Sequence, residues 1–257
     1  TQYSNMHLKA PSSVFRSFKA QKESHWLKVG EREVLRLFHL ACKKVPAYRE
    51  FLHKHKINPK NIKNLEDFKI VTPTDKDNYL RAYSYEKLFW KGNVNKPMTI
   101  HSTSGSTGEP TYFQRDFYAD LRRVVAVENY FYLNDLTTKG PTLFVITFGM
   151  GLWSAGLGIH IGAYLASNFK NLPISIVSPG VNKTEAVKVL RNLAPHYKQV
   201  IIAGYPPLVK DIIDDALLEG INTKKMNMRF IFTGEAFPEE FRDYLIEKTG
   251  IKNILLD

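Results

Sequence analysis

The sequence TLFVIT at residues 142–147 is the clearest indication of the fold. It is a short, continuous apolar run rich in β-branched and aromatic side chains, which predicts a strand buried on both faces. Similar runs follow it along the chain: ISIVS at 174–178, QVIIA at 199–203 and RFIFT at 229–233, with one more strand expected at 253–256. Strands of this kind are typical of parallel sheets.

Helical patterns alternate with these strands. We expect helices at 119–133, 184–193, 208–218 and 238–248. We also expect a glycine-rich turn, Gly149–Gly158, followed by a helix of small residues that runs to Ala166. Near-continuous apolar strands separated by helices predict an α/β fold, with mostly parallel sheets flanked by helices on both faces.

The first part of the chain has a different character. Apolar residues between Glu31 and Tyr48 recur at three- and four-residue spacing, which predicts a helix that Pro46 closes. We therefore divide the chain into a helical N-terminal region, residues 1–98, that packs on the core, and an α/β core, residues 99–257.

The composition excludes several classes of protein. No run of about 18 apolar residues exists, so we expect no membrane span. The single cysteine, Cys42, can form neither an internal disulfide nor a cysteine metal site, and we expect a small core residue there. No His/Cys/Glu cluster has metal-ligand spacing, so we predict no metal site. The first 20 residues lack the apolar segment of a signal peptide, and we expect a cytoplasmic protein.

The formal net charge is +11, which two kinds of surface explain. Nucleic-acid-binding proteins carry such a charge as a basic stripe or an arginine-rich helix. Here the lysines are spread along the chain, with a loose concentration at 54–69. We therefore expect a solvated basic surface, attractive to polyanions in general, and treat nucleic-acid binding as the weaker alternative.

The loop HSTSGSTGEPT at 101–111 carries the strongest chemical signal. It joins two expected strands, 99–101 and 111–114, and its hydroxyl residues alternate with Gly105 and Gly108. Glycines let backbone N–H groups approach an anion, and hydroxyls add further donors. No Gly-Lys-Ser/Thr follows, so it is not a Walker loop. A flexible turn and a phosphate-binding loop both fit this composition.

The spacing of this loop resembles the phosphate-binding loop of the adenylate-forming superfamily, in its phenylacetate–coenzyme A ligase branch. In that branch a Thr follows the Pro, as Thr111 does here, where most of the superfamily has Lys. Glu109 departs from the branch, in which a Lys is common at this position.

Other segments resemble the same branch and occur in its order. They are Leu65–Phe68 with Thr72–Lys76, the glycine-rich Phe148–Ala163, Phe232–Pro238, and Leu255–Asp257 just ahead of the family's Tyr-Gly-x-Thr/Ser-Glu. The resemblance runs from about residue 30 to the end of the chain, and implies the larger N-terminal adenylation domain of that fold, truncated and without the small C-terminal domain.

The resemblance also implies the site. The phosphates of ATP would be bound by Thr103, Ser104, Gly105, Ser106, Thr107 and Gly108, and the adenine by Gly234, Glu235, Ala236 and Phe237. His160 would lie near the carboxylate of the acid, as a candidate catalytic residue. Candidates for an apolar acyl pocket are Phe148, Trp153, Gly156, Gly158 and Tyr205. Taken singly, the aromatic residues and His160 are typical of a core, and the glycines fit tight helix–sheet packing equally well.

The implied reaction has two steps. A carboxylate attacks ATP, with Mg²⁺, to give an acyl-adenylate and pyrophosphate, and coenzyme A then takes the acyl group as a thioester. Phenylacetate or another aryl acid is the expected substrate. Alternatives are an acyl-protein synthetase or a capsule-biosynthesis relative with another acceptor, and a non-catalytic nucleotide- or acyl-binding module. We expect small-molecule partners, no membrane span, and a possible homodimer.

The first prediction concerns activity. The family's magnesium-binding Glu, ribose-binding Asp and catalytic Lys would all follow Asp257, so they are not in these 257 residues. Removing a group that stabilises transition-state charge costs about a hundredfold or more in rate. We expect the purified 257-residue chain to show almost no ATP–pyrophosphate exchange. Ready exchange would contradict this.

Overall fold

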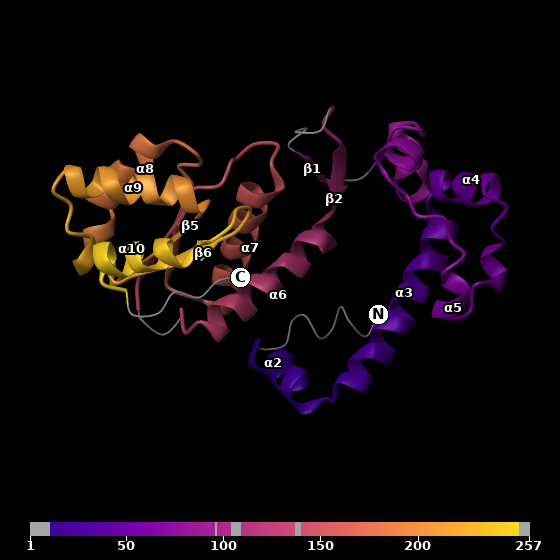
Figure 1. The fold of residues 1–257 in the computed structure, drawn as a ribbon, viewed down its shortest axis with the longest axis horizontal. Coiled ribbons are helices and arrows are strands. Elements are labelled where there is room, and N and C mark those ends of the chain that lie inside the picture. The colour runs from indigo at the N-terminus through magenta and orange to yellow at the C-terminus, as the bar shows by residue number, and fades with distance from the viewer. Residues whose placement is uncertain (1–10, 96, 104–108, 137–139, 252–257) are drawn as a thin grey trace. The chain divides into compact units, whose positions relative to one another are not determined.

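The computed structural model describes residues 11–95, 97–103, 109–136 and 140–251. The chain divides into two compact units, one of residues 16–98 and one that contains the described parts of residues 1–15 and 99–257 (Figure 1). Each unit has its own hydrophobic core.

The N-terminal unit is helical. Its helices are α2 (Pro11–Ala20), α3 (Glu23–Lys44), α4 (Pro46–Lys54) and α5 (Leu65–Phe68). A single helical turn, η1 (Pro59–Asn61), lies between α4 and α5, and three more follow α5: η2 (Lys76–Leu80), η3 (Tyr85–Leu88) and η4 (Trp90–Gly92). The helix expected between residues 31 and 48 is two helices, because Pro46 ends α3 and occupies the first turn of α4. Proline is well tolerated there, since the first N–H groups of a helix have no partner within it.

A small apolar cluster holds this unit together. Its buried members are Phe38, Cys42, Phe51, Leu52, Ile57 and Ile62. Cys42 is thus the core residue that the sequence indicates, and burial raises the pKa of its thiol to about 11. A protonated thiol is a poor nucleophile, so this cysteine is structural.

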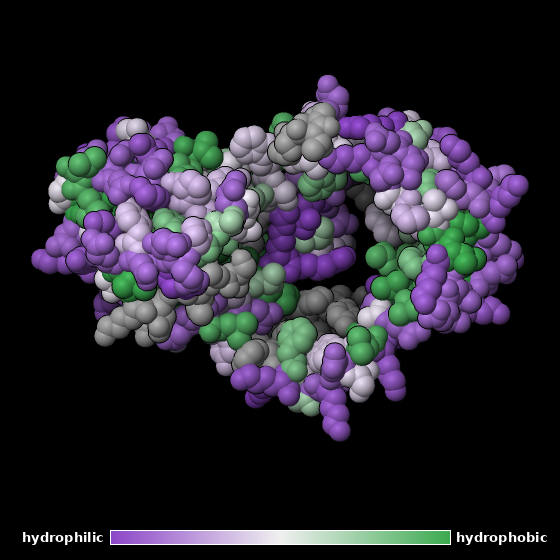
Figure 2. All heavy atoms as spheres, viewed as in Figure 1, coloured by the Kyte–Doolittle hydropathy of each residue, from purple (hydrophilic) through white to green (hydrophobic). Residues whose placement is uncertain are grey.

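The basic charge is concentrated in the helical unit. Residues 16–98 contain 19 Lys and Arg against nine Asp and Glu, which accounts for ten of the eleven net positive charges. Figure 2 shows hydrophilic residues over much of the visible face of this unit. The remainder of the chain is therefore close to neutral.

The second unit contains a four-stranded parallel sheet in the order β4-β3-β5-β6. Its strands are β3 (Thr142–Ile146), β4 (Ile174–Val177), β5 (Gln199–Gly204) and β6 (Met228–Phe232). Its helices are α6 (Phe117–Leu133), α7 (Ser154–Lys170), α8 (Lys183–Asn192), α9 (Pro206–Leu218) and α10 (Glu239–Thr249), with single turns η5 (Ala194–His196) and η6 (Thr223–Lys225). The predicted α/β class with a parallel sheet between helices is confirmed. The strand expected at 253–256 lies outside the described residues.

Alternate residues of the central strands enter two different cores. Leu143 and Val145 of β3 pack with α8, α9 and α10 on one face of the sheet. Phe144 and Ile146 pack with α6 and α7 on the other. All five β3 residues are buried, as expected for a parallel strand covered on both sides.

A two-stranded antiparallel hairpin precedes the sheet. Strand β1 (Thr99–Ser102) pairs with β2 (Tyr112–Arg115), with Ser102 opposite Tyr112. The Ser102 N–H donates to the carbonyl of Leu152 at 2.8 Å, and Ser102 forms a parallel bridge with Trp153. The hairpin is therefore joined directly to the glycine-rich segment that follows β3.

One boundary within that segment is wrong in the sequence interpretation. We expected a turn from Gly149 to Gly158, but α7 begins at Ser154, so Gly156 and Gly158 are buried helical residues. Their small size serves close packing, which lets neighbouring atoms occupy the space that a side chain would fill.

Within the described parts of the chain, none of the helices combines the length and the apolar character that a membrane span needs.

The second prediction concerns a buried carboxylate in α6. Glu128 is 4% exposed, and its nearest cation is Lys170 of α7, 3.9 Å away. Burial raises the pKa of Glu128, with Lys170 offsetting only part of the effect. A carboxyl whose pKa is raised by folding stabilises the fold while protonated, and that contribution is lost as pH rises through the folded-state pKa.

We therefore expect Glu128→Gln to raise the free energy of unfolding at pH 7 by about 1 kcal/mol, because an amide carries no charge into the interior. The gain should shrink as pH falls toward 4.5, the ordinary pKa of a Glu. Urea unfolding at both pH values measures it. The exposed Glu185→Gln is the control, and equal pH dependence in wild type and Glu128→Gln would contradict the prediction.

Candidate functional site

The candidate site lies at the carboxyl edge of the parallel sheet. The chain leaves β3 toward β4 on one side, whereas β5 leads to β6 on the other. Such a reversal in strand order opens a crevice between two neighbouring strand ends, and ligands of open α/β sheets bind there. The segments that follow β3 and β5 carry predicted site residues, Phe148 and Tyr205.

Phe148 and Tyr205 meet at this edge. Their ring centroids are 5.2 Å apart with the rings perpendicular, a favourable edge-to-face arrangement. Phe148 is fully buried, whereas Tyr205 is half-buried. Next to them the Thr147 hydroxyl donates to the carbonyl of Ala203 at 3.0 Å, which ties the two strand ends together.

The segment after β6 reaches the same aromatic pair. Gly234 has a φ of 92°, and a Cβ at this position would lie 2.9 Å from a carbon of the Tyr205 ring. Tyr205 therefore lies against the backbone of the segment predicted to contact adenine. Gly234, Glu235 and Ala236 are exposed. Phe237 packs against the ring of Phe232 in the core, with a centroid distance of 5.1 Å.

His160 belongs to α7 and faces the end of β4. Its Nδ1 is 2.8 Å from the hydroxyl oxygen of Ser178, and the imidazole is half-buried. A histidine held at one ring nitrogen by a hydroxyl has a fixed orientation and presents its other nitrogen in a defined direction. The partner Ser178 gave no signal in the sequence, because it follows the strand as an ordinary polar residue.

The glycines before and within α7 have packing partners. A Cβ at Gly149 would lie 1.8 Å from the Trp153 ring, so the indole rests on this backbone while remaining 45% exposed. A Cβ at Gly156 would meet the Gly149 carbonyl oxygen at 2.4 Å. Gly158 faces Arg123 of α6 in the same way. The structure thus brings Phe148 and Tyr205 together, whereas Gly158 contacts α6.

Only part of the predicted phosphate-binding loop belongs to the described residues. Of its residues, Thr103 is described, and residues 104–108 lie outside the described part. The Thr103 N–H donates to the Thr111 carbonyl at 3.0 Å, and the Thr111 N–H donates to the Thr103 hydroxyl at 3.0 Å. These bonds close the base of the hairpin, and Glu109 beside it is exposed.

Sequence reasoning missed a polar cluster beneath the hairpin. Its members are His101, Arg115, Asp120 and Arg123. Arg115 donates to the Asp120 carboxylate at 3.3 Å, and His101 is fully buried beside Phe113. Burial lowers the pKa of His101, and the nearby Arg123 and Arg115 lower it further. The sequence did contain a signal for this cluster. Arg122 and Arg123 are adjacent on an expected helix, and such a helix packs one face inward.

No metal centre accompanies these residues. Among the residues that the structure describes, no three His, Cys, Asp or Glu side chains come together as a metal ion would need.

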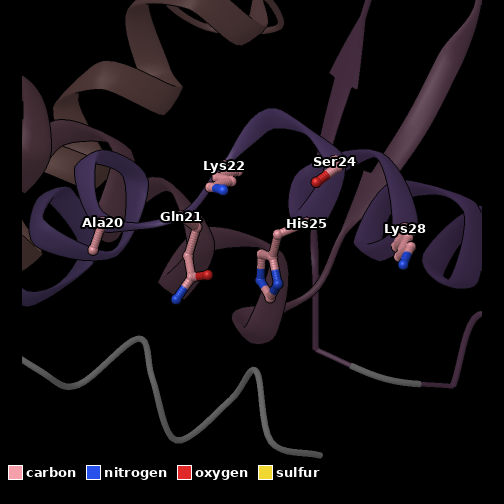
Figure 3. Close-up of a pocket in the computed structure, with 6 residues that line it drawn as sticks. All are labelled: Ala20, Gln21, Lys22, Ser24, His25 and Lys28. Carbon is pink, nitrogen blue, oxygen red and sulfur yellow. The ribbon is translucent and has the colours of Figure 1, made fainter.

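A basic hollow lies elsewhere, at the junction of α2 and α3 (Figure 3). It is lined by Ala20, Gln21, Lys22, Ser24, His25 and Lys28. Every lining residue comes from one short stretch of the helical unit, and all of them are exposed. None belongs to the predicted site, so this hollow does not bear on the site's chemistry.

Comparison with characterised proteins gives phenylacetate–coenzyme A ligases. The chain is 24% identical over 227 residues to the enzyme of Thermus thermophilus, covering 87% of this chain and 47% of the relative. It is 26% identical over 216 residues to the Pseudomonas putida enzyme, covering 80% and 44%. The chain thus spans about half the length of the curated relatives it matches. No model of a known protein family matches it.

Solved structures show the same fold. A 2-hydroxyisobutyryl-CoA ligase in complex with 2-HIB-AMP and CoA superposes with a TM-score of 0.67 at 20% identity, covering 90% of this chain and 48% of that one. An open conformation of that ligase gives a TM-score of 0.64 at 20% identity, covering 84% and 50%. The resemblance to the phenylacetate–coenzyme A ligase branch and its adenylate-forming fold is therefore confirmed.

The third prediction tests the contact between Gly234 and Tyr205. An alanine at a positive φ costs about 1 to 2 kcal/mol. Gly220 has a φ of 75°, and no atom lies within 4 Å of the place that a methyl group would take there, so Gly220→Ala reports that cost alone. We expect Gly234→Ala to cost more, because its methyl also displaces the Tyr205 ring. Urea unfolding of both variants measures the difference, and equal costs would show that Tyr205 is not held there.

Proposed function

We propose that this chain, similar in sequence to phenylacetate–coenzyme A ligases and in fold to a 2-hydroxyisobutyryl-CoA ligase, is the nucleotide- and acid-binding part of an AMP-forming acid–thiol ligase. One observation carries the proposal. The hydroxyl-and-glycine hairpin is joined through Ser102 and Leu152 to the carboxyl edge of the parallel sheet. A loop suited to polyphosphate therefore begins where α/β sheets bind their ligands.

The proposed reaction is the one that the resemblance to phenylacetate–coenzyme A ligases implies. A carboxylate oxygen attacks the α-phosphorus of ATP, forming an acyl-adenylate and releasing pyrophosphate. The thiol of coenzyme A then attacks the acyl carbon, the thioester forms, AMP leaves, and the thiol proton is released. Mg²⁺ accompanies ATP as the counter-charge of its phosphates.

The proposed roles of the residues divide along the sheet edge. Residues 103–108 hold the β- and γ-phosphates, and residues 234–237 line the adenine. His160, oriented by Ser178, borders the acid's carboxylate. Trp153 and Tyr205 would supply aromatic surface for the acyl group, which suits an aryl acid such as phenylacetate. The buried Phe148 would support the Tyr205 ring, with Gly156 and Gly158 shaping the neighbouring segment.

Two other functions use the same scaffold. An acyl-protein synthetase or a capsule-biosynthesis relative would form the acyl-adenylate but pass the acyl group to a protein cysteine or another acceptor. A non-catalytic module would bind nucleotide or acid without turnover. A test of several acyl acceptors with the whole protein separates these functions from the ligase. Thioester formation with coenzyme A would contradict both alternatives. A cytoplasmic location, a homodimer and the inactivity of the isolated chain remain predictions.

The fourth prediction tests nucleotide binding. We expect ATP to bind the chain, and Ser104→Ala/Ser106→Ala to weaken binding about tenfold or more, because a hydrogen bond to a charged group contributes about 1.5 to 3 kcal/mol. Calorimetric titration measures the dissociation constant. The matched control is Ser84→Ala, an exposed serine whose side chain does not cap its helix.

An unchanged affinity in the double variant would remove the hairpin from the site, and absence of ATP binding by the unmodified chain would remove the proposed function. A screen of carboxylic acids by pyrophosphate release, with the whole protein, then identifies the substrate.

A further inference from the structure

The first two turns of α6 contact both segments that border the candidate site. On one side, Arg115 at the end of β2 donates to the Ala119 carbonyl at 2.9 Å and to the Asp120 carboxylate at 3.3 Å. The Asp120 side chain is 11% exposed, so this ion pair is largely shielded from water. The open end of the hairpin, where Arg115 pairs with Thr99, is thereby fixed to α6.

On the other side, Arg123 reaches the start of α7. One terminal nitrogen of its guanidinium donates to the Ser154 hydroxyl at 2.8 Å, and the other lies 3.4 Å from the Ser154 carbonyl oxygen. The same guanidinium occupies the space beside Gly158, where a Cβ would lie only 1.4 Å from one of its nitrogens. Any side chain at position 158 would expel the Arg123 head group.

Together these contacts connect the hairpin, α6 and the glycine-rich segment, each to the other two. Ser102 of β1 binds Leu152, Arg115 of β2 binds α6, and Arg123 of α6 binds Ser154, two residues beyond Leu152. The hairpin and the glycine-rich segment are therefore held by α6 as well as by their direct hydrogen bond. Burial lowers the pKa of Arg123, and the neighbouring Arg115 lowers it further, while Asp120 raises it.

We propose that Arg123 is a positioning residue, which sets the glycine-rich segment at a fixed distance from the hairpin so that acid and nucleotide meet in reacting geometry. This inference rests on the proposed function. Arg123 touches neither substrate in this scheme. It acts through Ser154, Trp153 and Leu152, the residues that connect the two halves of the site.

The two contacts of Arg123 with Ser154 favour arginine at this position. A planar guanidinium donates from two nitrogens at once, to a hydroxyl and to a backbone carbonyl, whereas an ammonium presents a single point charge. In reactions between two bound substrates, a displacement of about 1 Å costs roughly a hundredfold in rate. A residue that fixes the separation of two binding segments therefore influences turnover without contacting either ligand.

The fifth prediction begins with the chain free of any nucleotide. We expect Arg123→Gln and Gly158→Ala each to speed hydrogen exchange about tenfold or more at backbone amides of 99–103, 111–115 and 152–158. Amides of β3 and β5 should be unaffected. In the Arg123→Gln background, Gly158→Ala should add little, because it acts by displacing Arg123. The exposed neighbour, Arg122→Gln, is the control.

The kinetic test uses the whole protein, with rates expressed per nucleotide-binding site so that unfolded molecules do not count. We expect Arg123→Gln to lower kcat about a hundredfold while the dissociation constant of ATP changes less than about threefold, and Arg123→Lys to restore part of the rate.

The outcomes distinguish failure of the positioning role of Arg123 from failure of the proposed function. Unchanged exchange at the hairpin and glycine-rich segment, or wild-type kcat in Arg123→Gln, would overturn the positioning role while leaving the ligase intact. A chain that binds no ATP would overturn the proposed function, and the exchange experiment would still decide whether Arg123 holds the two segments together.

Discussion

The pairing of β3 with β5 is the constraint on which the rest of the α/β unit depends. The two strands run parallel in register from Thr142 opposite Gln199 to Ile146 opposite Ala203, so they end together. Because their connections depart in opposite directions, the chain does not close over the gap between the two ends. Phe148 and Tyr205 emerge there as neighbours, and Gly234 joins them from the next strand. A site built on the ends of strands that are neighbours in the sheet is held rigidly, because the sheet itself is rigid.

Glycine has a second role in this unit, beyond permitting unusual turns. Gly149 accommodates an indole, Gly158 a guanidinium, and Gly204 the hydroxyl of Thr147, which a Cβ would approach to 2.0 Å. In each case the missing side chain lets a larger neighbour pack onto the backbone. Interiors are packed as densely as organic crystals, so such vacated volumes are filled by defined partners. The glycine-rich segment is consequently a packed junction between the hairpin, α6 and the sheet.

Charge and chemistry are separated along the chain. The helical unit carries almost all of the net positive charge, whereas the α/β unit with the candidate site is nearly neutral. In the helical unit, Tyr48, Phe51 and Tyr79 pack against one another in the core. Proteins that bind single-stranded nucleic acid expose aromatic rings among their basic residues for base stacking. Phe18 and Trp90 of the helical unit are exposed, so a solvated basic surface stays a prediction, with nucleic-acid binding as its alternative.

The sequence by itself determined the α/β class and the positions of the strands in the parallel sheet, because apolar periodicity and turn residues are local properties of a chain. The candidate site segments came from the resemblance to phenylacetate–coenzyme A ligases. Local patterns placed the end of the glycine-rich turn wrongly, because Gly156 and Gly158 lie within α7 and pack against Gly149 and Arg123, tertiary contacts that leave no local pattern. The pairing of His160 with Ser178, and of Arg123 with Ser154, came from tertiary structure alone. These partners are 18 and 31 residues apart, and a hydrogen bond between distant residues has no periodicity that a sequence could display.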